Sequence, residues 1–261
     1  MLFGLQTGHL MNLTDLLTRT RSYRRFYEDR PLNEETLIDL VALTRLCPSG
    51  ANRQPLKYYL SCSPEQNAAI FPHLGWAKWL PDWHGPEEGE RPAGYIAILG
   101  DTRIAERPDN DAAIAAYTIL LGATAYGLGG CMIAWIDREG LAETLEIPSH
   151  LRLLLAVALG HPKETIVLED ATSPNDIAYW RDATGVHHVP KRPLEELLLE
   201  PELVGAAAHR WPALTCLEGQ SLLAAEDCPS GPAIPLVGVV NTAGFSDDGW
   251  PQSMEAPLHH A

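Results

Sequence analysis

The chain has 261 residues, of which 46% are hydrophobic and 20% charged, and this is the composition of a globular protein with a substantial core. Its net charge of -15 argues against nucleic acid and anionic membranes as partners, because both require a basic surface. The five cysteines are odd in number and include no C-x-x-C pair, which argues against a disulfide framework or a zinc cluster and favours the cytoplasm.

The first half of the chain predicts helices and one strand around a long loop. Residues 12–20 form an amphipathic pattern, and Asn33 is a plausible N-cap for a second helix. The expected elements are helices at 12–20, 34–46 and 65–71 and a strand at 57–61. The aromatic loop at 75–92 follows, with Trp76, Trp79 and Trp83 as side chains that pack or roof a pocket.

The second half alternates strands and helices without a regular β-α-β period, which indicates an α+β fold. Residues 112–136 contain no charge, but glycines 127, 129 and 130 interrupt them and basic flanks are missing. We interpret this segment as a helix buried on all sides, then a turn and a strand, rather than a membrane span. The expected elements are strands at 95–99, 131–135 and 153–159, helices at 111–126, 138–145 and 194–199, and irregular chain before residue 193.

The two ends of the chain differ from the middle in their sequence pattern. Residues 1–11 are expected to be a leader of little structural importance. Residues 12–204 are expected to form the folded domain. Prolines and glycines interrupt every apolar run of residues 205–261, so we expect this tail to be poorly ordered.

A first candidate site is the cluster Arg21, Ser22 and Arg24. Guanidinium groups, a hydroxyl and free backbone N–H groups are what a bound phosphate requires. The alternative is a solvated basic face. Lys191 and Arg192 form a second phosphate-binding candidate, with a surface turn as the alternative.

The loop from Pro48 to Pro55 is a second candidate. Ser49, Asn52 and Gln54 offer neutral donors and acceptors for the polar edge of a planar heterocycle, and Gly50 permits unusual dihedral angles. A simple helix C-terminal turn is the alternative.

The glycine run around Gly129 and Gly130 is not a dinucleotide fingerprint, because it follows a helix and precedes a strand. We expect these glycines to let backbone N–H groups approach a flat ring. His187 and His188 have no Asp, Glu or Cys partner at a suitable spacing, so no metal site is predicted.

Taken in order, four motifs resemble the FMN-dependent nitroreductase family over residues 12–199. They are Arg21-Ser22-x-Arg24-x-Phe26, Pro48-Ser49-x-x-Asn52-x-Gln54-Pro55, the apolar helix ending in Gly127-Leu128-Gly129, and Pro190-Lys191-Arg192-Pro193. The resemblance implies a mixed or antiparallel central sheet flanked by helices, in an intertwined homodimer with FMN at the interface. Thr20 stands where the family often has another arginine.

By the same resemblance, Arg21, Ser22 and Arg24, with Lys191 or Arg192, hold the FMN phosphate. Ser49, Gly50 and Asn52 come from the partner subunit, and Gly129 and Gly130 touch the ring. The implied activity is NAD(P)H-dependent reduction of nitroaromatics, quinones or similar electron-poor acceptors by ping-pong hydride transfer, with no catalytic side chain. Dehalogenation, enone reduction and non-catalytic flavin binding are the alternatives.

Overall fold

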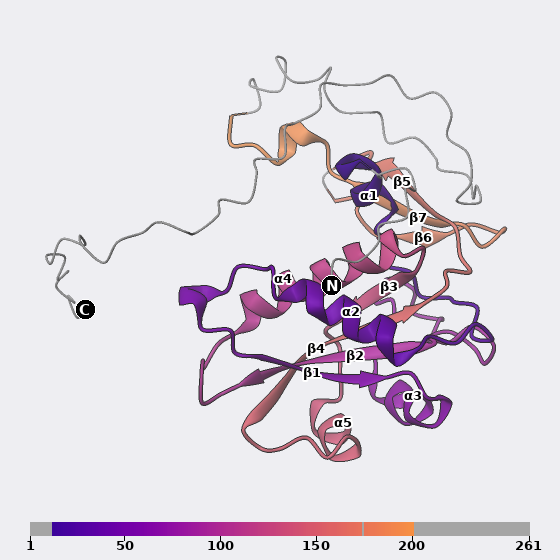
Figure 1. Cartoon of the computed structure of the whole chain (residues 1–261). Coiled ribbons are helices and arrows are strands. Elements are labelled where there is room, and N and C mark those ends of the chain that lie inside the picture. The colour runs from indigo at the N-terminus through magenta and orange to yellow at the C-terminus, as the bar shows by residue number, and fades with distance from the viewer. Residues whose placement is uncertain (1–11, 174, 201–261) are drawn as a thin grey trace, which may run out of the picture. The chain divides into compact units, whose positions relative to one another are not determined.

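The structure, a computed structural model, describes residues 12–173 and 175–200 (Figure 1). The expected leader at 1–11 and tail at 205–261 lie outside the described residues. Among the described helices, none combines the length and the apolar character that crossing a bilayer requires.

A four-stranded antiparallel sheet forms the centre of the fold. Its strands are β1 (Leu56–Ser61), β2 (Gly94–Asp101), β3 (Gly129–Ile133) and β4 (Leu151–Gly160), in the order β1-β2-β4-β3. The sheet register pairs Ile96 of β2 with Leu60 of β1 and with Val157 of β4. Because β2 and β4 are central, they read as nearly continuous apolar runs, and every residue of β2 is buried.

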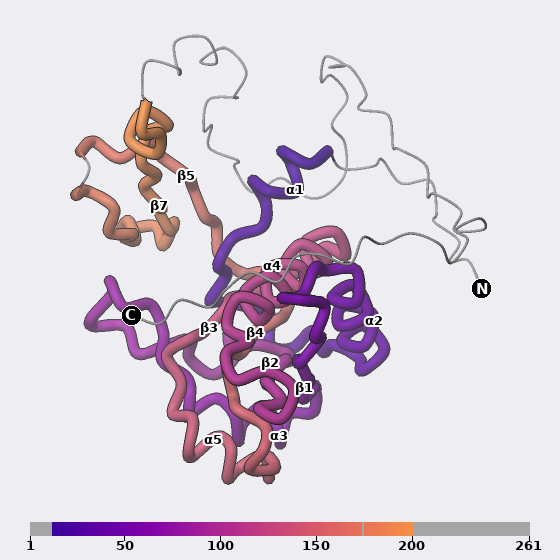
Figure 2. The backbone as a smooth tube through the Cα atoms, turned by 90° about the vertical axis from the view of Figure 1, so that its left-hand side faces the viewer, coloured from indigo at the N-terminus to yellow at the C-terminus, as the bar shows by residue number. Residues whose placement is uncertain are grey.

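Helices cover both faces of this sheet, and each face has its own core. Ile96 and Ile98 point to a cluster shared with α2 (Glu34–Thr44) and α4 (Asp109–Ala125). The alternate residues of β2 point to the opposite cluster, which includes side chains of α3 (Pro64–Ile70) and α5 (Arg138–Thr144). Figures 1 and 2 show the two helix pairs on opposite sides of the strands. The expected α+β fold is confirmed.

The helix α4, which has no charged residue after Asp111, is buried on one side and exposed on the other. Ile119 and Ala123 are fully buried, whereas Ile114 is 39% and Tyr117 41% exposed. The expectation of a helix buried on all sides is therefore wrong for the single chain. A run without charged residues indicates an apolar segment. It does not distinguish a helix face that packs in the core from an apolar face that the single chain leaves exposed.

A glycine in the left-handed conformation ends α4. Gly127 has φ 74°, and Leu128 donates its backbone N–H to the carbonyl of Ala123 at 2.8 Å. This is the Schellman arrangement, which turns the chain directly into β3. The first glycine of the run, Gly127, therefore ends the helix.

The first helix lies beside α4 and has no core of its own. α1 (Leu13–Arg19) has Asn12 as its N-cap and no buried residue. Its C-cap residue Thr20 is joined to the end of α4 by a hydrogen bond of 3.0 Å between the hydroxyls of Thr20 and Thr124.

After β4 the chain forms a second sheet that the sequence did not predict. β5 (Ile166–Asp170) pairs in parallel with β7 (His187–Lys191), and β6 (Trp180–Arg181) is antiparallel to β7. The expectation of irregular chain up to residue 193 is therefore wrong. The strands are short and contain histidines and a proline, so they lack the usual β signature. The helix expected at 194–199 is only the 3-10 turn Leu194–Glu196.

Candidate functional site

The first candidate segment runs extended against the edge of the central sheet. Ser22 forms a parallel bridge with Gly130, and Tyr23 donates its backbone N–H to the Gly130 carbonyl at 3.0 Å. Phe26, which is fully buried, forms an antiparallel bridge with Pro162. These backbone contacts fix the position of the side chains between them.

Arg21 and Lys191 lie within electrostatic reach of each other. Burial lowers the pKa of Arg21, and burial together with the positive charge of Arg21 lowers the pKa of Lys191. The Arg21 Nη2 donates to the Leu17 carbonyl at 2.6 Å, but its buried Nε has no acceptor among the described residues. Two crowded cations with an unused donor favour an anion between them. Arg192 is exposed and follows directly after Lys191.

The side chain of Arg24 lies near the first residue of β7, His187, whereas Arg21 lies near its last residue, Lys191. The Arg24 backbone N–H donates to the Glu164 carboxylate, and its Nη1 lies 3.2 Å from the Ser22 carbonyl and 3.5 Å from His187 Nε2. The guanidinium is 4.9 Å from the centre of the Tyr179 ring. Arg21 and Arg24 are thus arranged along β7, near its last and its first residue.

None of the three cations Arg21, Arg24 and Lys191 forms an ion pair with a carboxylate among the described residues. Arg25, Lys163 and Arg181, which lie nearby, do form such pairs. A phosphate dianion needs charge-assisted donors that are not already neutralised. Arg21 and Lys191 at the last residue of β7, and Arg24 at its first, therefore keep charged donors available for an anionic ligand.

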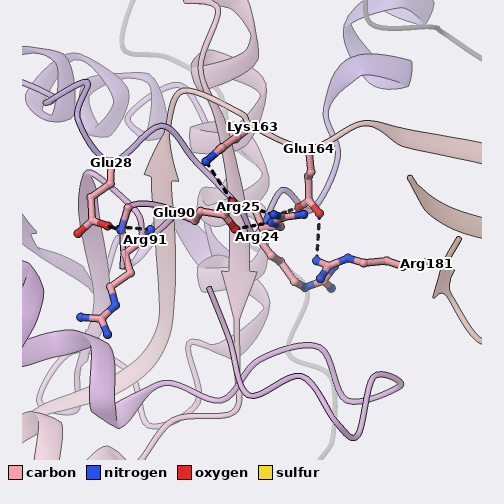
Figure 3. Close-up of polar contacts among 9 residues, drawn as sticks. Arg24, Arg25, Glu28, Glu90, Arg91, Lys163, Glu164 and Arg181 are labelled. Atoms are coloured by element: carbon pink, nitrogen blue, oxygen red, sulfur yellow. Dashed lines mark hydrogen bonds and ion pairs between the residues drawn. The ribbon is translucent and has the colours of Figure 1, made fainter. Parts of the chain in front are cut away.

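Neighbouring cations are neutralised, and they hold the cluster in place (Figure 3). Glu90 receives both Nη2 of Arg25 at 2.7 Å and Nζ of Lys163 at 3.1 Å, and these cations lower its pKa to about 2. Arg181 pairs at 3.1 Å with Glu164, whose side chain is 1% exposed. The network ties the loop at 75–92 and the segment after β4 to both sides of Arg24.

A cavity of about 150 Å³ opens beside Arg24. Its other walls come from the beginning of the 75–92 loop and from the end of β3, and they include Trp76, Lys78, Cys131 and Trp135. The sequence had indicated neither Lys78 nor the residues after Gly130 as site residues. Of the three loop tryptophans, only Trp76 lines this cavity.

The other two loop tryptophans have structural contacts. The Arg181 guanidinium lies 4.2 Å from the Trp83 ring centre, and the Trp79 backbone N–H donates to the Tyr179 hydroxyl at 3.3 Å. Trp79 is nevertheless 52% exposed. Both contacts connect the loop to the second sheet.

The second candidate loop is held by an acidic residue of α4 that the sequence did not single out. Ser49 Oγ donates to one oxygen of Asp111 at 2.5 Å, and the Gly50 backbone N–H donates to the other at 3.1 Å. Gln54 Nε2 lies 3.1 Å from Asn52 Oδ1. The polar groups of this loop are thus held by Asp111 of α4 and by one another, as both the binding and the turn interpretations allow.

The strained backbone of this loop lies at different residues from the one expected. Ala51, Asn52 and Gln54 have φ of 48°, 52° and 50°, whereas Gly50 is not among the residues of positive φ. Left-handed backbone at non-glycine residues is costly and concentrates at functional sites. This loop has three such residues within four positions, which favours a binding role over a simple turn.

Within one chain the two candidate loops do not meet. The Ser49 loop is attached to Asp111 in the first turn of α4, and the Arg21 segment follows Thr20, which bonds to Thr124 in its last turn. Thirteen residues of helix separate these anchors by about 20 Å. Pro48, Ser49, Gly50, Asn52 and Gln54 therefore lie apart from Arg21, Ser22, Arg24, Lys191 and Arg192.

The glycines at the start of β3 are explained by packing within the chain. A Cβ on Gly129 would lie 2.5 Å from the Tyr23 ring, and one on Gly130 would lie 2.6 Å from the Ala158 carbonyl oxygen. Both glycines are buried. The role expected for them at a flat ring stays a prediction.

The second sheet gives His188 contacts with carboxylates that the sequence did not predict. Carboxylates do approach one of the two histidines, since His188 Nδ1 lies 3.1 Å from Glu169 and its Nε2 lies 3.5 Å from Asp182. Sequence spacing could not reveal these pairs. No cluster of three or more potential metal-ligating side chains occurs among the described residues.

Comparison with known proteins agrees with this architecture. The family model described as the nitroreductase family matches residues 17–161. A curated protein of Archaeoglobus fulgidus, provisionally named an NADH dehydrogenase/NAD(P)H nitroreductase, is 26% identical over 153 residues, which are 56% of this chain and 83% of that protein.

Solved structures show the same fold. A nitroreductase family protein of Clostridium difficile 630 has a TM-score of 0.52 at 19% identity, over 72% of this chain and 97% of that one. A Staphylococcus epidermidis protein, provisionally named an NAD(P)H:FMN oxidoreductase, has a TM-score of 0.50 at 16% identity, over 60% of this chain and 90% of that one. Because the family model covers more than half of the chain, this protein belongs to the nitroreductase family.

Proposed function

We propose that this chain is an FMN-dependent oxidoreductase that uses NADH or NADPH to reduce electron-poor acceptors such as nitroaromatics and quinones. The observation that carries the proposal is the cluster of Arg21, Arg24 and Lys191, three cations without carboxylate partners among the described residues. The family supports it, as do the NAD(P)H and FMN in the names of two similar proteins.

In this proposal the cluster binds the FMN phosphate. Arg21 and Lys191 contribute charge at one end of β7, Arg24 contributes a guanidinium at the other, and Ser22 contributes its hydroxyl. Arg192 extends the cluster at the surface. The Glu90 and Glu164 ion pairs keep the neighbouring cations occupied, so that these carboxylates do not compete for Arg21 and Arg24.

When bound, FMN would supply the two-electron chemistry, by accepting hydride from NAD(P)H and passing it to the acceptor in a ping-pong sequence. The protein's part is to bind, to orient and to exclude water. We place the reacting ring against the cavity beside Arg24, whose walls include Trp76 and Trp135. No side chain is assigned a proton-transfer role.

We further propose that the protein works as a cytoplasmic homodimer. The two candidate loops are too far apart within one chain for a single ligand, and the exposed side chains Ile114 and Tyr117 form an apolar face on the helix between them. A partner on this face would add its Pro48, Ser49, Gly50, Asn52 and Gln54 to the site, with Gly129 and Gly130 near the ring. Cys47, Cys62 and Cys131 are free thiols, which supports a reducing compartment.

The test is a visible spectrum of the purified protein before and after anaerobic addition of NADPH, and then of NADH. We expect flavin absorption that is bleached by at least one of them. A colourless protein that takes up no added FMN contradicts the proposal. Tightly bound FMN that neither nicotinamide reduces indicates a flavin-binding protein without turnover.

A further inference from the structure

The cavity that borders the proposed flavin site has two walls from distant parts of the chain, and hydrogen bonds fasten them together. Gly75 donates its backbone N–H to the Trp135 carbonyl at 2.8 Å, and Leu74 forms an antiparallel bridge with Ile136. A Cβ on Gly75 would overlap the Trp135 ring. The indole of Trp135 therefore packs directly on the start of the 75–92 loop.

The loop then makes a strained turn around Lys78. Ala77 is buried and has φ 33°, a left-handed conformation that is costly for a residue with a Cβ. Its carbonyl accepts the backbone N–H of Leu80 at 2.8 Å, and the backbone N–H of Trp79 donates to the Tyr179 hydroxyl at 3.3 Å. Both neighbours of Lys78 are thus held in place, and Lys78 itself lines the cavity.

Lys78 keeps its charge available in the part of the chain that the structure describes. Its side chain is exposed and forms no ion pair with a described residue. Among the described residues that line the cavity, none is acidic, whereas Arg24 and Lys78 are cationic. Arg24 belongs to the flavin site of the proposed function, which leaves Lys78 for a second molecule.

The rest of the cavity is mostly apolar and has room for one aromatic ring. Its lining includes the indoles of Trp76 and Trp135 and the side chains of Met132 and Ile133. Its volume is about 150 Å³, and an apolar cavity of roughly 150 Å³ in a protein core is enough to hold benzene. Indole walls favour a flat ligand, because aromatic rings pack well face to edge or offset.

We propose that Lys78 selects the acceptor, so that this enzyme prefers single-ring aromatic compounds that carry an anionic substituent, a carboxylate or a sulfonate. The inference rests on the proposed function and deepens it by naming a substrate class. The ring packs against the indoles of the cavity, and the ammonium group of Lys78 pairs with the anionic substituent.

The experiment measures the oxidative half-reaction of the full-length holoprotein by anaerobic stopped-flow, after photochemical reduction of the flavin. The probes are para-nitrobenzoate and para-nitrobenzamide, which differ by one charge and little in shape. In Lys78→Met we expect the anionic-to-neutral ratio of second-order rate constants to fall by about fivefold or more, as for a partly shielded ion pair. Comparing this ratio between variants cancels the different intrinsic reactivities of the two probes.

Two control variants and a binding measurement accompany this experiment. Lys78→Arg keeps the charge and should keep the wild-type ratio. Arg107→Met removes the same charge from an exposed site outside the cavity, and it should also keep the ratio. Calorimetric titration of the oxidised holoprotein with benzoate and benzamide, which cannot accept the electrons, should show the same fall in the ratio of affinities in Lys78→Met.

The outcomes separate this inference from the proposed function. A ratio that Lys78→Met leaves unchanged, or that Arg107→Met lowers equally, overturns the inference while the proposed function stands. A Lys78→Met variant that slows only flavin reduction by NADPH also overturns it, because Lys78 would then contact a phosphate of the nicotinamide donor. A wild type that takes up no FMN, or whose reduced flavin passes electrons to neither probe, contradicts the proposed function and the inference with it.

Discussion

Arg24 is the residue on which most of the candidate site depends. Its backbone is held by the buried Glu164, its guanidinium lies near both His187 and Tyr179, and it borders the cavity. Guanidinium groups with such neighbours lose little freedom on binding an anion, which is why preorganised arginines are effective phosphate ligands.

We expect Arg24→Ala to weaken FMN binding by roughly ten- to hundredfold. This corresponds to the loss of a charge-assisted hydrogen bond of about 1.5–3 kcal/mol. A fluorescence titration of the apoprotein measures it. Arg107→Ala is the matched control, since Arg107 is exposed and forms no ion pair among the described residues. Equal FMN affinity in the two variants would remove Arg24 from the site.

His187 also predicts how stability depends on pH. Its pKa is about 4 in the folded chain against an ordinary 6.5, so between these values the unfolded chain binds more protons. The free energy of unfolding should therefore fall as the pH is lowered from about 6.5 to about 4, by up to about 3 kcal/mol from this group.

Urea denaturation at a series of pH values measures this effect without any ligand. In His187→Gln the corresponding part of the slope should disappear. A wild-type curve that matches the Gln variant across this window shows that the imidazole is freely protonated in the folded state.

At the scale of elements, a close contact between α2 and α4 determines the position of α4 on the sheet. A Cβ on Gly122 of α4 would overlap Leu43 of α2 and lie 3.0 Å from Leu40. The glycine lets two helices of the same layer approach each other closely, at the cost of about 1 kcal/mol in helix propensity.

We expect Gly122→Ala to destabilise the fold by about 1–3 kcal/mol, because overpacking outweighs the gain in helix propensity. Thermal and urea denaturation measure the change. In a Leu43→Ala background the same substitution should cost less, since space has been made for the new methyl group. A net stabilisation by Gly122→Ala alone would show that Leu43 moves away freely.

The second sheet shows at the same scale where sequence patterns fail. Its strands β5 to β7 were expected to be irregular chain, yet they supply His187, Lys191 and Arg181. Alternation of apolar and polar residues marks a strand only when one face is buried in a core. These strands instead bury histidines and ion-paired side chains, so their pattern was not visible.

At the scale of the whole molecule, the exposed face of α4 is where we expect the second subunit. Ile114→Glu places a charge on that face, and it should weaken dimerisation by at least about tenfold because a buried unpaired carboxylate is costly. FMN content should fall with it, since the Ser49 loop would come from the partner.

Sedimentation velocity and the flavin-to-protein ratio measure both effects together. Ile177→Glu is the matched control, because Ile114 and Ile177 are each 39% exposed and Ile177 lies in the loop before β6. A monomeric wild type that holds a full complement of FMN contradicts the dimer proposal.

The sequence by itself predicted the strands of the central sheet, its four main helices and the residues that we propose bind the phosphate. These follow from local chemistry: caps such as Asn33, buried runs such as that of β2, and cations beside a hydroxyl at Arg21, Ser22 and Arg24. Only the tertiary structure decided which cations remain without a carboxylate, which side of α4 is open, and that His187 faces Arg24. Those facts depend on contacts between segments far apart in the chain, such as Glu164 with Arg24 and Asp111 with Ser49, and no local pattern records them.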